Sequence, residues 1–346
     1  MSAVPFHGIV QHSDWTPYGQ PLRGVRVLLI LLGGGLSSVA VADVGPRICR
    51  GHTNVISAVT FAADGRRVIT ASWDKTLRVW DARSGAALAT LTGHRDWVFA
   101  VAAAPDGRRL VSASQHAVRV WNAKTYQPVH THEGLGGATV NTVALSPDAR
   151  RVATGGRQGN LRVWSLESQA LDALHTFGGF ESWVTRVSIS ADNQIVAAAA
   201  RDGRLRLFDL TKGRERKPAV PQAGQPILSL AFSPLGDSLA TGGHDRIVRL
   251  WNPENSARVS QFPAHKGIVT AVAWSADGQR LASGERHGHI KLWDTTRPEP
   301  LVLTLAGHAD DRLGFSVTAL AFSPDGQHLA SAAYDKTLKL WDLPDK

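Results

Sequence analysis

The sequence predicts an all-β fold built from seven copies of one antiparallel unit. An aromatic residue, usually Trp and often followed by Asp, recurs seven times at intervals of 41 to 48 residues. A turn motif such as Pro-Asp-Gly precedes it in every unit. Apolar and polar residues alternate on both sides of that turn, which is the period of a β-strand. Such repeats can use all 346 residues as one architecture, so they take precedence over a division by length.

The first half of each unit is predicted to be a β-hairpin. In the first unit the alternating segment "ISAVTF" precedes the turn "AADG", and "RRVITAS" follows it. The corresponding turns are "APDG", "SPDA", "SADN", "SPLG", "SADG" and "SPDG". Their Asp, Pro and Gly residues suit tight turns, so we interpret these carboxylates as structural.

A third strand is predicted to end at each recurring aromatic residue. The segments "LRVW", "VRVW", "LRVW", "LRLF", "VRLW", "IKLW" and "LKLW" alternate apolar and basic residues, as a strand requires. They end at Trp80, Trp121, Trp164, Phe208, Trp251, Trp293 and Trp341. Each unit therefore contains several antiparallel strands and no helix.

Several units open with Gly-His, and the period from Gly-His to Trp-Asp resembles the WD40-repeat family. The resemblance covers Gly51 to Asp342 and includes period, turn and terminal aromatic residue. It implies a seven-bladed β-propeller with four-stranded antiparallel blades over residues 43–346. The repeats are expected to end near residues 81, 122, 165, 209, 252, 294 and 342.

The resemblance also implies how the ring closes. The outermost strand of a blade precedes the next Gly-His, so the last blade receives no such strand downstream of Trp341. The segment 44–50, in "VGPRICRGH", stands where "LATLTGH" stands in another unit. We expect it to pair with the last blade, which removes an exposed sheet edge. Cys49 then takes the place of Leu91 and is expected to be a packing residue.

The N-terminal segment predicts export. Arg23 and Arg26 precede an apolar run from Val27 to Ala42 that ends in small residues, so residues 1–42 resemble a secretory signal cleaved before Asp43. The run has 16 residues and three consecutive glycines, which makes a retained membrane anchor the weaker alternative. The polar lead of 26 residues is long for a signal, which leaves a downstream start and a cytoplasmic protein as a further alternative.

A recurring set of His, Ser or Thr, Asp and Trp could be mistaken for a catalytic triad. The resemblance implies a structural hydrogen-bond chain within each blade instead. The first and seventh units carry the full set, namely His52, Asp74 and Trp80, and His308, Asp335 and Trp341. Thr70 or Ser72 supplies the hydroxyl in the first unit and Ser331 in the seventh.

The middle units depart from that set. The second keeps His94 but has Gln115 and His116 at the Asp position, and the third has Gln158 there and no Gly-His. The fourth and fifth units keep Asp202 and Asp245 without Gly-His, and the sixth has His265 with His287. No metal-ligand spacing, phosphate-binding loop or nucleophile motif is found, so we assign no catalytic residue, metal or cofactor. A propeller enzyme with an unrecognised site is the alternative.

The resemblance places a partner-binding face on the loops after Gly-His and on the turns that carry the Asp position. The residues there are Trp73, Trp97, Arg157, Trp183, Arg201, His244, Arg286 and Tyr334. Exposed Trp and Arg are typical of binding hot spots, and Arg suits carboxylates. We therefore expect a scaffold that binds a protein or peptide partner with acidic segments. The alternative is ordinary surface Arg with Trp shielding the blade junctions.

The charge of the chain bears on the remaining partner classes. The net charge is +9, yet seven basic residues occupy one repeated strand position spread around the ring. They are Arg78, Arg119, Arg162, Arg206, Arg249, Lys291 and Lys339. Such dispersion does not suit tracking of one phosphate backbone, so nucleic acid is the less favoured partner despite the run Lys212–Lys217. The single Cys excludes an intrachain disulfide, and we expect a monomeric propeller.

Overall fold

The computed structural model describes most of the chain. The described residues are 26–32, 35–41, 45–133, 139–167, 171–216, 224–263, 265–297, 301–308 and 316–344. The chain divides into two compact units, Met1–Gly45 and Pro46–Lys346, which are considered separately.

In the first unit, β1 (Arg26–Leu32) and β2 (Gly35–Val41) pair as antiparallel strands. The predicted polar lead before Arg26 and the predicted cleavage position before Asp43 lie outside the described residues, so export stays a prediction. Within the described ranges, no helix is long and apolar enough to cross a bilayer.

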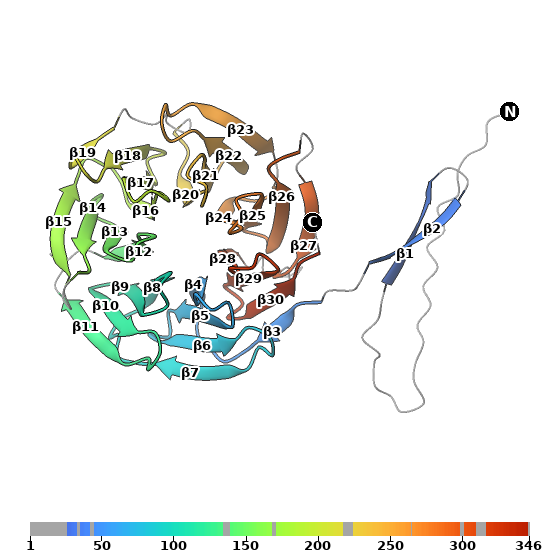
Figure 1. Cartoon of the computed structure of the whole chain (residues 1–346), viewed down its shortest axis with the longest axis horizontal. Helices are drawn as coiled ribbons and strands as arrows, with labels where there is room; N and C mark the ends of the chain where they lie inside the picture. The colour runs from blue at the N-terminus through green and yellow to red at the C-terminus, as the bar shows by residue number, and fades with distance from the viewer. Residues whose placement is uncertain are drawn as a thin grey trace. The chain divides into compact units, whose positions relative to one another are not determined.

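The second unit is a seven-bladed β-propeller, as predicted (Figure 1). Each blade is a four-stranded antiparallel sheet. Blades 1 to 4, from the innermost to the outermost strand, are β4 (Ile56–Phe61), β5 (Arg67–Ser72), β6 (Leu77–Asp81) and β7 (Ala87–Leu91); β8 (Val98–Ala103), β9 (Arg109–Ser114), β10 (Ala117–Asn122) and β11 (Pro128–Glu133); β12 (Val140–Leu145), β13 (Arg151–Gly156), β14 (Leu161–Ser165) and β15 (Asp172–Phe177); and β16 (Val184–Ile189), β17 (Ile195–Ala200), β18 (Leu205–Asp209) and β19 (Arg214–Glu215).

Blades 5 to 7 follow the same order. They are β20 (Ile227–Phe232), β21 (Leu239–Gly243), β22 (Ile247–Trp251) and β23 (Arg258–Pro263); β24 (Val269–Trp274), β25 (Arg280–Glu285), β26 (His289–Asp294) and β27 (Leu301–Ala306); and β28 (Val317–Phe322), β29 (His328–Ala333), β30 (Leu338–Asp342) and β3 (Arg47–Cys49). Each innermost strand packs against the innermost strand of the next blade, and β28 packs against β4, so the ring is closed (Figure 1).

The core lies between the blades, because each sheet is covered on both faces. The second strand of every blade is consequently buried almost throughout, as in β17, which has the sequence IVAAAA. Small residues allow this close approach. At Gly156 a Cβ atom would lie 1.9 Å from the carbonyl oxygen of Thr139. Strands covered on both faces lose the apolar-polar alternation of a half-exposed sheet, which explains their continuous apolar pattern.

The last blade is completed by a strand from the beginning of the propeller, which confirms the predicted closure. Arg47 pairs with Leu340, and Cys49 pairs with Leu338. The Arg47 guanidinium donates to both carboxylate oxygens of Asp342, at 2.8 and 2.6 Å. Cys49 is 2% exposed and acts as a packing residue. Its burial raises the pKa of the thiol to about 11, so it is not a reactive thiolate at neutral pH.

Candidate interaction face

Two kinds of loop meet on one face of the propeller, which we call the loop face. In an antiparallel blade, the turn between the second and third strands and the loop leading into the first strand lie at the same end of the sheet. All eight residues predicted to bind a partner lie in these two kinds of loop: Trp73, Trp97, Arg157, Trp183, Arg201, His244, Arg286 and Tyr334.

A repeated backbone hydrogen bond positions the turn residues beside the innermost strands. The N–H of Arg157 donates to the carbonyl of Thr139 at 3.0 Å, and the N–H of Arg201 donates to Trp183 at 3.0 Å. Trp73, His244, Arg286 and Tyr334 make the equivalent bond in their blades. Each acceptor directly precedes its innermost strand, except Ser316 and Val55, which also lie one residue before β28 and β4. The predicted residues therefore surround the axis of the ring.

Four aromatic side chains from three blades form one cluster on the loop face. Trp73 stacks on Trp97 with a centroid separation of 4.9 Å and an angle of 9° between the rings. Tyr334 lies edge-on to Trp73 at 5.5 Å, and Phe99 lies edge-on at 6.4 Å. Trp97 and Tyr334 remain 44% and 43% exposed. We call Trp73, Trp97, Phe99 and Tyr334 the aromatic cluster, and its exposed rings offer a large apolar contact surface.

Two of the predicted arginines gather on one tryptophan. The guanidinium carbons of Arg157 and Arg201 lie 4.5 and 4.8 Å from the ring centroid of Trp183. This cation–π arrangement orients both guanidinium groups while Trp183 stays 36% exposed. Holding the arginines in place reduces the side-chain entropy that binding would otherwise cost.

The loop-face arginines are not neutralised within the protein. No carboxylate of the described residues forms an ion pair with Arg157, Arg201 or Arg286. Nearby Arg204, in contrast, pairs with Glu181 at 2.5 Å. Burial raises the pKa of Tyr334, and Arg286 opposes this rise, which places the cation near the aromatic cluster.

The predicted structural networks of the first and seventh units are present. In blade 1, Trp80 Nε1 donates to Thr70 Oγ1 at 2.8 Å, Thr70 contacts His52 Nε2 at 2.8 Å, and His52 Nδ1 lies 2.7 Å from the Asp74 carboxylate. Blade 7 repeats these contacts with Ser331 as the hydroxyl. Burial alone would raise the pKa of Asp74, but hydrogen bonds from His52 and Thr76 outweigh it and lower that pKa.

The middle blades keep only parts of this network. In blade 2, Ser112 accepts from Trp121 and contacts His94, while Nδ1 of His94 is buried without a partner. In blade 6, Ser283 takes the same role between Trp293 and His265. Blades 3 and 5 retain only the bond from Trp to Thr154 or Thr241. In blade 4, Phe208 and Ala198 replace both Trp and hydroxyl. Gln158 and His287 take no position in these chains.

The incomplete networks make the stability of the propeller sensitive to mild acid. Burial lowers the pKa of His94 to about 3 and that of His265 to about 4. Since both are depressed, the unfolded chain binds these protons first as the pH falls below about 6.5. We expect the free energy of unfolding to decrease between pH 6.5 and pH 4, with each histidine adding a slope of up to about 1.4 kcal/mol per pH unit.

Denaturant unfolding at neutral pH and at about pH 5 tests this dependence, because the Asp74 contribution is lost only below the ordinary Asp pKa of about 3.9. The variant His94→Gln should lose part of the dependence, whereas His130→Gln, on the outer strand of blade 2, should keep all of it. Identical profiles for His94→Gln and the unaltered protein would contradict the assignment.

Most of the repeated basic strand residues are engaged inside their own blades. Arg206 donates to Glu215 at 2.6 Å, Arg249 pairs with Asp245, and Lys339 donates to the carbonyl of Gly307. In the basic run after β18, Arg216 lies 3.3 Å from Glu254, and Lys217 lies outside the described residues. These pairs use cations that a nucleic acid would need.

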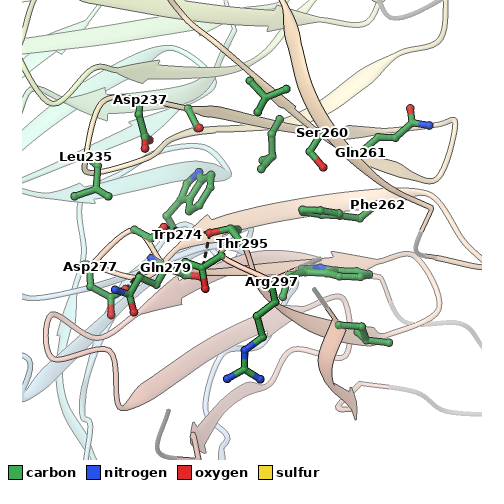
Figure 2. A pocket seen from close by; sticks show the side chains of 17 residues that line it. Leu235, Asp237, Ser260, Gln261, Phe262, Trp274, Asp277, Gln279, Thr295 and Arg297 are labelled. Atoms are coloured by element: carbon green, nitrogen blue, oxygen red, sulfur yellow. Dashed lines mark hydrogen bonds between the residues drawn. The ribbon is translucent and has the colours of Figure 1, made fainter. Parts of the chain in front are cut away.

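The largest pocket in the described part of the chain has a volume of about 1010 Å³ and lies between blades 5 and 6, away from the predicted residues (Figure 2). Trp274, Phe262 and Leu235 provide apolar walls, and Asp237 and Asp277 lie together at one end. Asp277 accepts hydrogen bonds from Ser275 and from the backbone of Gln279, at 2.6 and 3.0 Å. It is therefore a turn carboxylate, as predicted for this motif.

The sequence interpretation missed two features of the loop face. Phe99 belongs to the aromatic cluster, although it lies on β8 and shows no repeat signal. Arg186 lies on β16, in "VTRVSI", and the only sequence signal was a charged residue in an otherwise uncharged innermost strand. Among the described residues, no group of three His, Cys, Asp or Glu side chains gathers as a metal site.

Fold and site together define a seven-bladed propeller that presents repeat loops on one face. A family model described as "WD domain, G-beta repeat" matches residues 46–81, 85–122, 126–165, 171–209, 220–252, 256–294 and 299–342. The chain belongs to the WD40 family. The seven matched segments end at the same seven residues as the predicted repeats.

Several curated relatives share about a third of their residues with the matched part of the chain. "Small ribosomal subunit protein RACK1y" of Oryza sativa subsp. japonica is 32% identical over 72% of this chain and 77% of its own length. "Cross-pathway control WD-repeat protein 2" of Flammulina velutipes is 31% identical over 72% and 82%. "Autophagy-related protein 16" of Arabidopsis thaliana is 30% identical over 66% of this chain, which spans only 45% of that relative.

Proposed function

We propose that this WD40 propeller is a non-catalytic interaction platform whose loop face binds an acidic segment of a partner protein. The main support is the set of loop-face arginines that lack carboxylate partners among the described residues and flank exposed tryptophans. An acidic peptide would supply the missing charges, and the aromatic cluster would cover its apolar side chains. The name of the relative from Oryza sativa makes that protein part of a ribosomal subunit, which is in keeping with a role in assemblies.

Charge reversal of the loop face tests this proposal. We expect the variant Arg157→Glu, Arg201→Glu, Arg286→Glu to lose acidic partners while staying folded, because each reversal replaces attraction by repulsion at an exposed position. Peptide-display selection on the unaltered protein should enrich Asp and Glu, and selection on the variant should not.

A matched control reverses three exposed arginines of the opposite face, at Arg66, Arg108 and Arg150. This control has the same net charge as the loop-face variant, so it separates position from overall charge. It should select the same acidic peptides as the unaltered protein. Equal selection by both variants would move the site elsewhere, and selection without acidic residues would contradict the proposed partner.

A further inference from the structure

One charged side chain extends across the axis of the ring. Arg186 belongs to β16, the innermost strand of blade 4. Its Nη2 donates to the carbonyl of Thr318 at 3.3 Å, and its Nη1 donates to Thr185 at 3.4 Å. Thr318 lies on β28, which is reached from β16 only through β20 and β24 (Figure 1). The side chain therefore crosses to the opposite side of the ring.

Arg186 lies at the loop-face end of the axis. It follows Trp183 by three residues, and Trp183 holds the guanidinium groups of Arg157 and Arg201. Thr318 is likewise the second residue of its strand. The cation is thus next to the predicted binding residues and at the centre of the face that they surround.

The surroundings of Arg186 supply no negative charge. All seven innermost strands are described, and Arg186 is their only charged residue. Both of its acceptors are neutral carbonyl oxygens, and it forms no ion pair with any described carboxylate. Burial lowers the pKa of Arg186, because an apolar environment disfavours its charge.

The other blades show that the fold does not need a long side chain here. Arg186 pairs with Ala199 across the first hairpin of blade 4. The residues in the same register of the other six blades are all small: Ala58, Ala100, Thr142, Ser229, Ala271 and Ala319. A buried cation without a counter-charge is costly, so a purely structural role would be filled better by an apolar residue.

We propose that Arg186 forms an anion subsite on the propeller axis that binds one carboxylate of the docked segment. The guanidinium has five N–H donors, and its two hydrogen bonds to described residues use two of them. A carboxylate can accept two of the others in the bidentate geometry that Arg favours. The identity of the occupant rests on the proposed function, whereas the subsite itself depends only on Arg186.

The carboxylate probe trifluoroacetate, followed by ¹⁹F NMR, tests the subsite with the full chain. We expect line broadening with the unaltered protein, at least about tenfold weaker binding with Arg186→Met, and partial retention with Arg186→Lys. Trifluoroacetamide, the neutral analogue, should not bind. Displacement by N-acetylglutamate α-amide would indicate a side-chain carboxylate as the occupant, and displacement by N-acetylglutamine would indicate a chain terminus.

Thermal unfolding separates binding from a structural role. Arg186→Met should unfold at the same temperature as the unaltered protein or higher, since it removes an uncompensated charge. Unchanged trifluoroacetate binding by folded Arg186→Met overturns the subsite, and so does a lowered unfolding temperature of this variant without any loss of binding. Loss of acidic peptides by the triple loop-face variant with retained trifluoroacetate binding supports the subsite independently. Absence of acidic enrichment together with Arg186-dependent trifluoroacetate binding overturns only the proposed partner.

Discussion

A chain that begins at Gly51 will unfold at a markedly lower temperature than a chain that begins at Pro46. The four extra residues include β3, which pairs with β30 and buries Cys49 against the last blade. Their removal deletes these backbone hydrogen bonds, the Cys49 contacts and the bond from Arg47 to Asp342. We expect a loss of roughly 3 to 5 kcal/mol in the free energy of unfolding, or about 10 °C in Tm.

Calorimetry of the two chains measures this difference. The shorter chain exposes the edge of β30, so light scattering should also detect association between copies. A peptide of residues 43–50, added in excess, should restore part of the lost stability by occupying the vacant edge. Equal melting temperatures for the two chains would show that closure by β3 contributes little.

The second large effect concerns the hydroxyl that joins two buried groups. Ser331 Oγ accepts from Trp341 Nε1 at 3.0 Å and contacts His308 Nε2 at 2.8 Å. The variant Ser331→Ala removes both contacts without creating a sizeable cavity. We expect it to lower the free energy of unfolding by about 2 to 4 kcal/mol, because buried polar groups without partners carry their full desolvation cost.

Blade 3 offers the matched comparison for that variant. Thr154 accepts from Trp164 Nε1 at 2.9 Å, and no histidine joins this pair. The nearly isosteric variant Thr154→Val should therefore cost about 1 to 2 kcal/mol. Denaturant unfolding of both variants measures the difference. An equal loss in both blades would mean that the histidine contact adds nothing to the stability of blade 7.

The repeat architecture could be predicted in detail because every unit carries the same local signals. The Asp of each turn, the strand ending at Trp80 and its equivalents, and the closing strand before Gly51 all depend on local pattern and chain order. Such features follow from residue types and spacing alone. The closure prediction succeeded because a missing outer strand at one end of a ring has to be supplied by the other end.

Contacts between blades could not be predicted in the same way. The sequence placed Trp73, Trp97 and Tyr334 on one face, but their stacking depends on side-chain orientation across blades 7, 1 and 2. Likewise, the reach of Arg186 to Thr318 depends on the diameter of the ring, which no local pattern encodes. Blade 4 shows why the network prediction needs the pairing register. Phe208 and Ala198 lose donor and acceptor together, which leaves no polar group unpaired.

The shared sheet of blade 7 has a consequence for biosynthesis. Arg47 and Asp342 are 295 residues apart in the chain, yet they belong to neighbouring strands of one sheet. A ribosome releases β3 before any other strand of the propeller and β30 after all of them. During translation β3 therefore has no partner within its own chain, and blades 1 to 6 can assemble before the ring is complete. The last step of folding joins the earliest and latest parts of the nascent chain, which is the slow kind of contact in a β-protein.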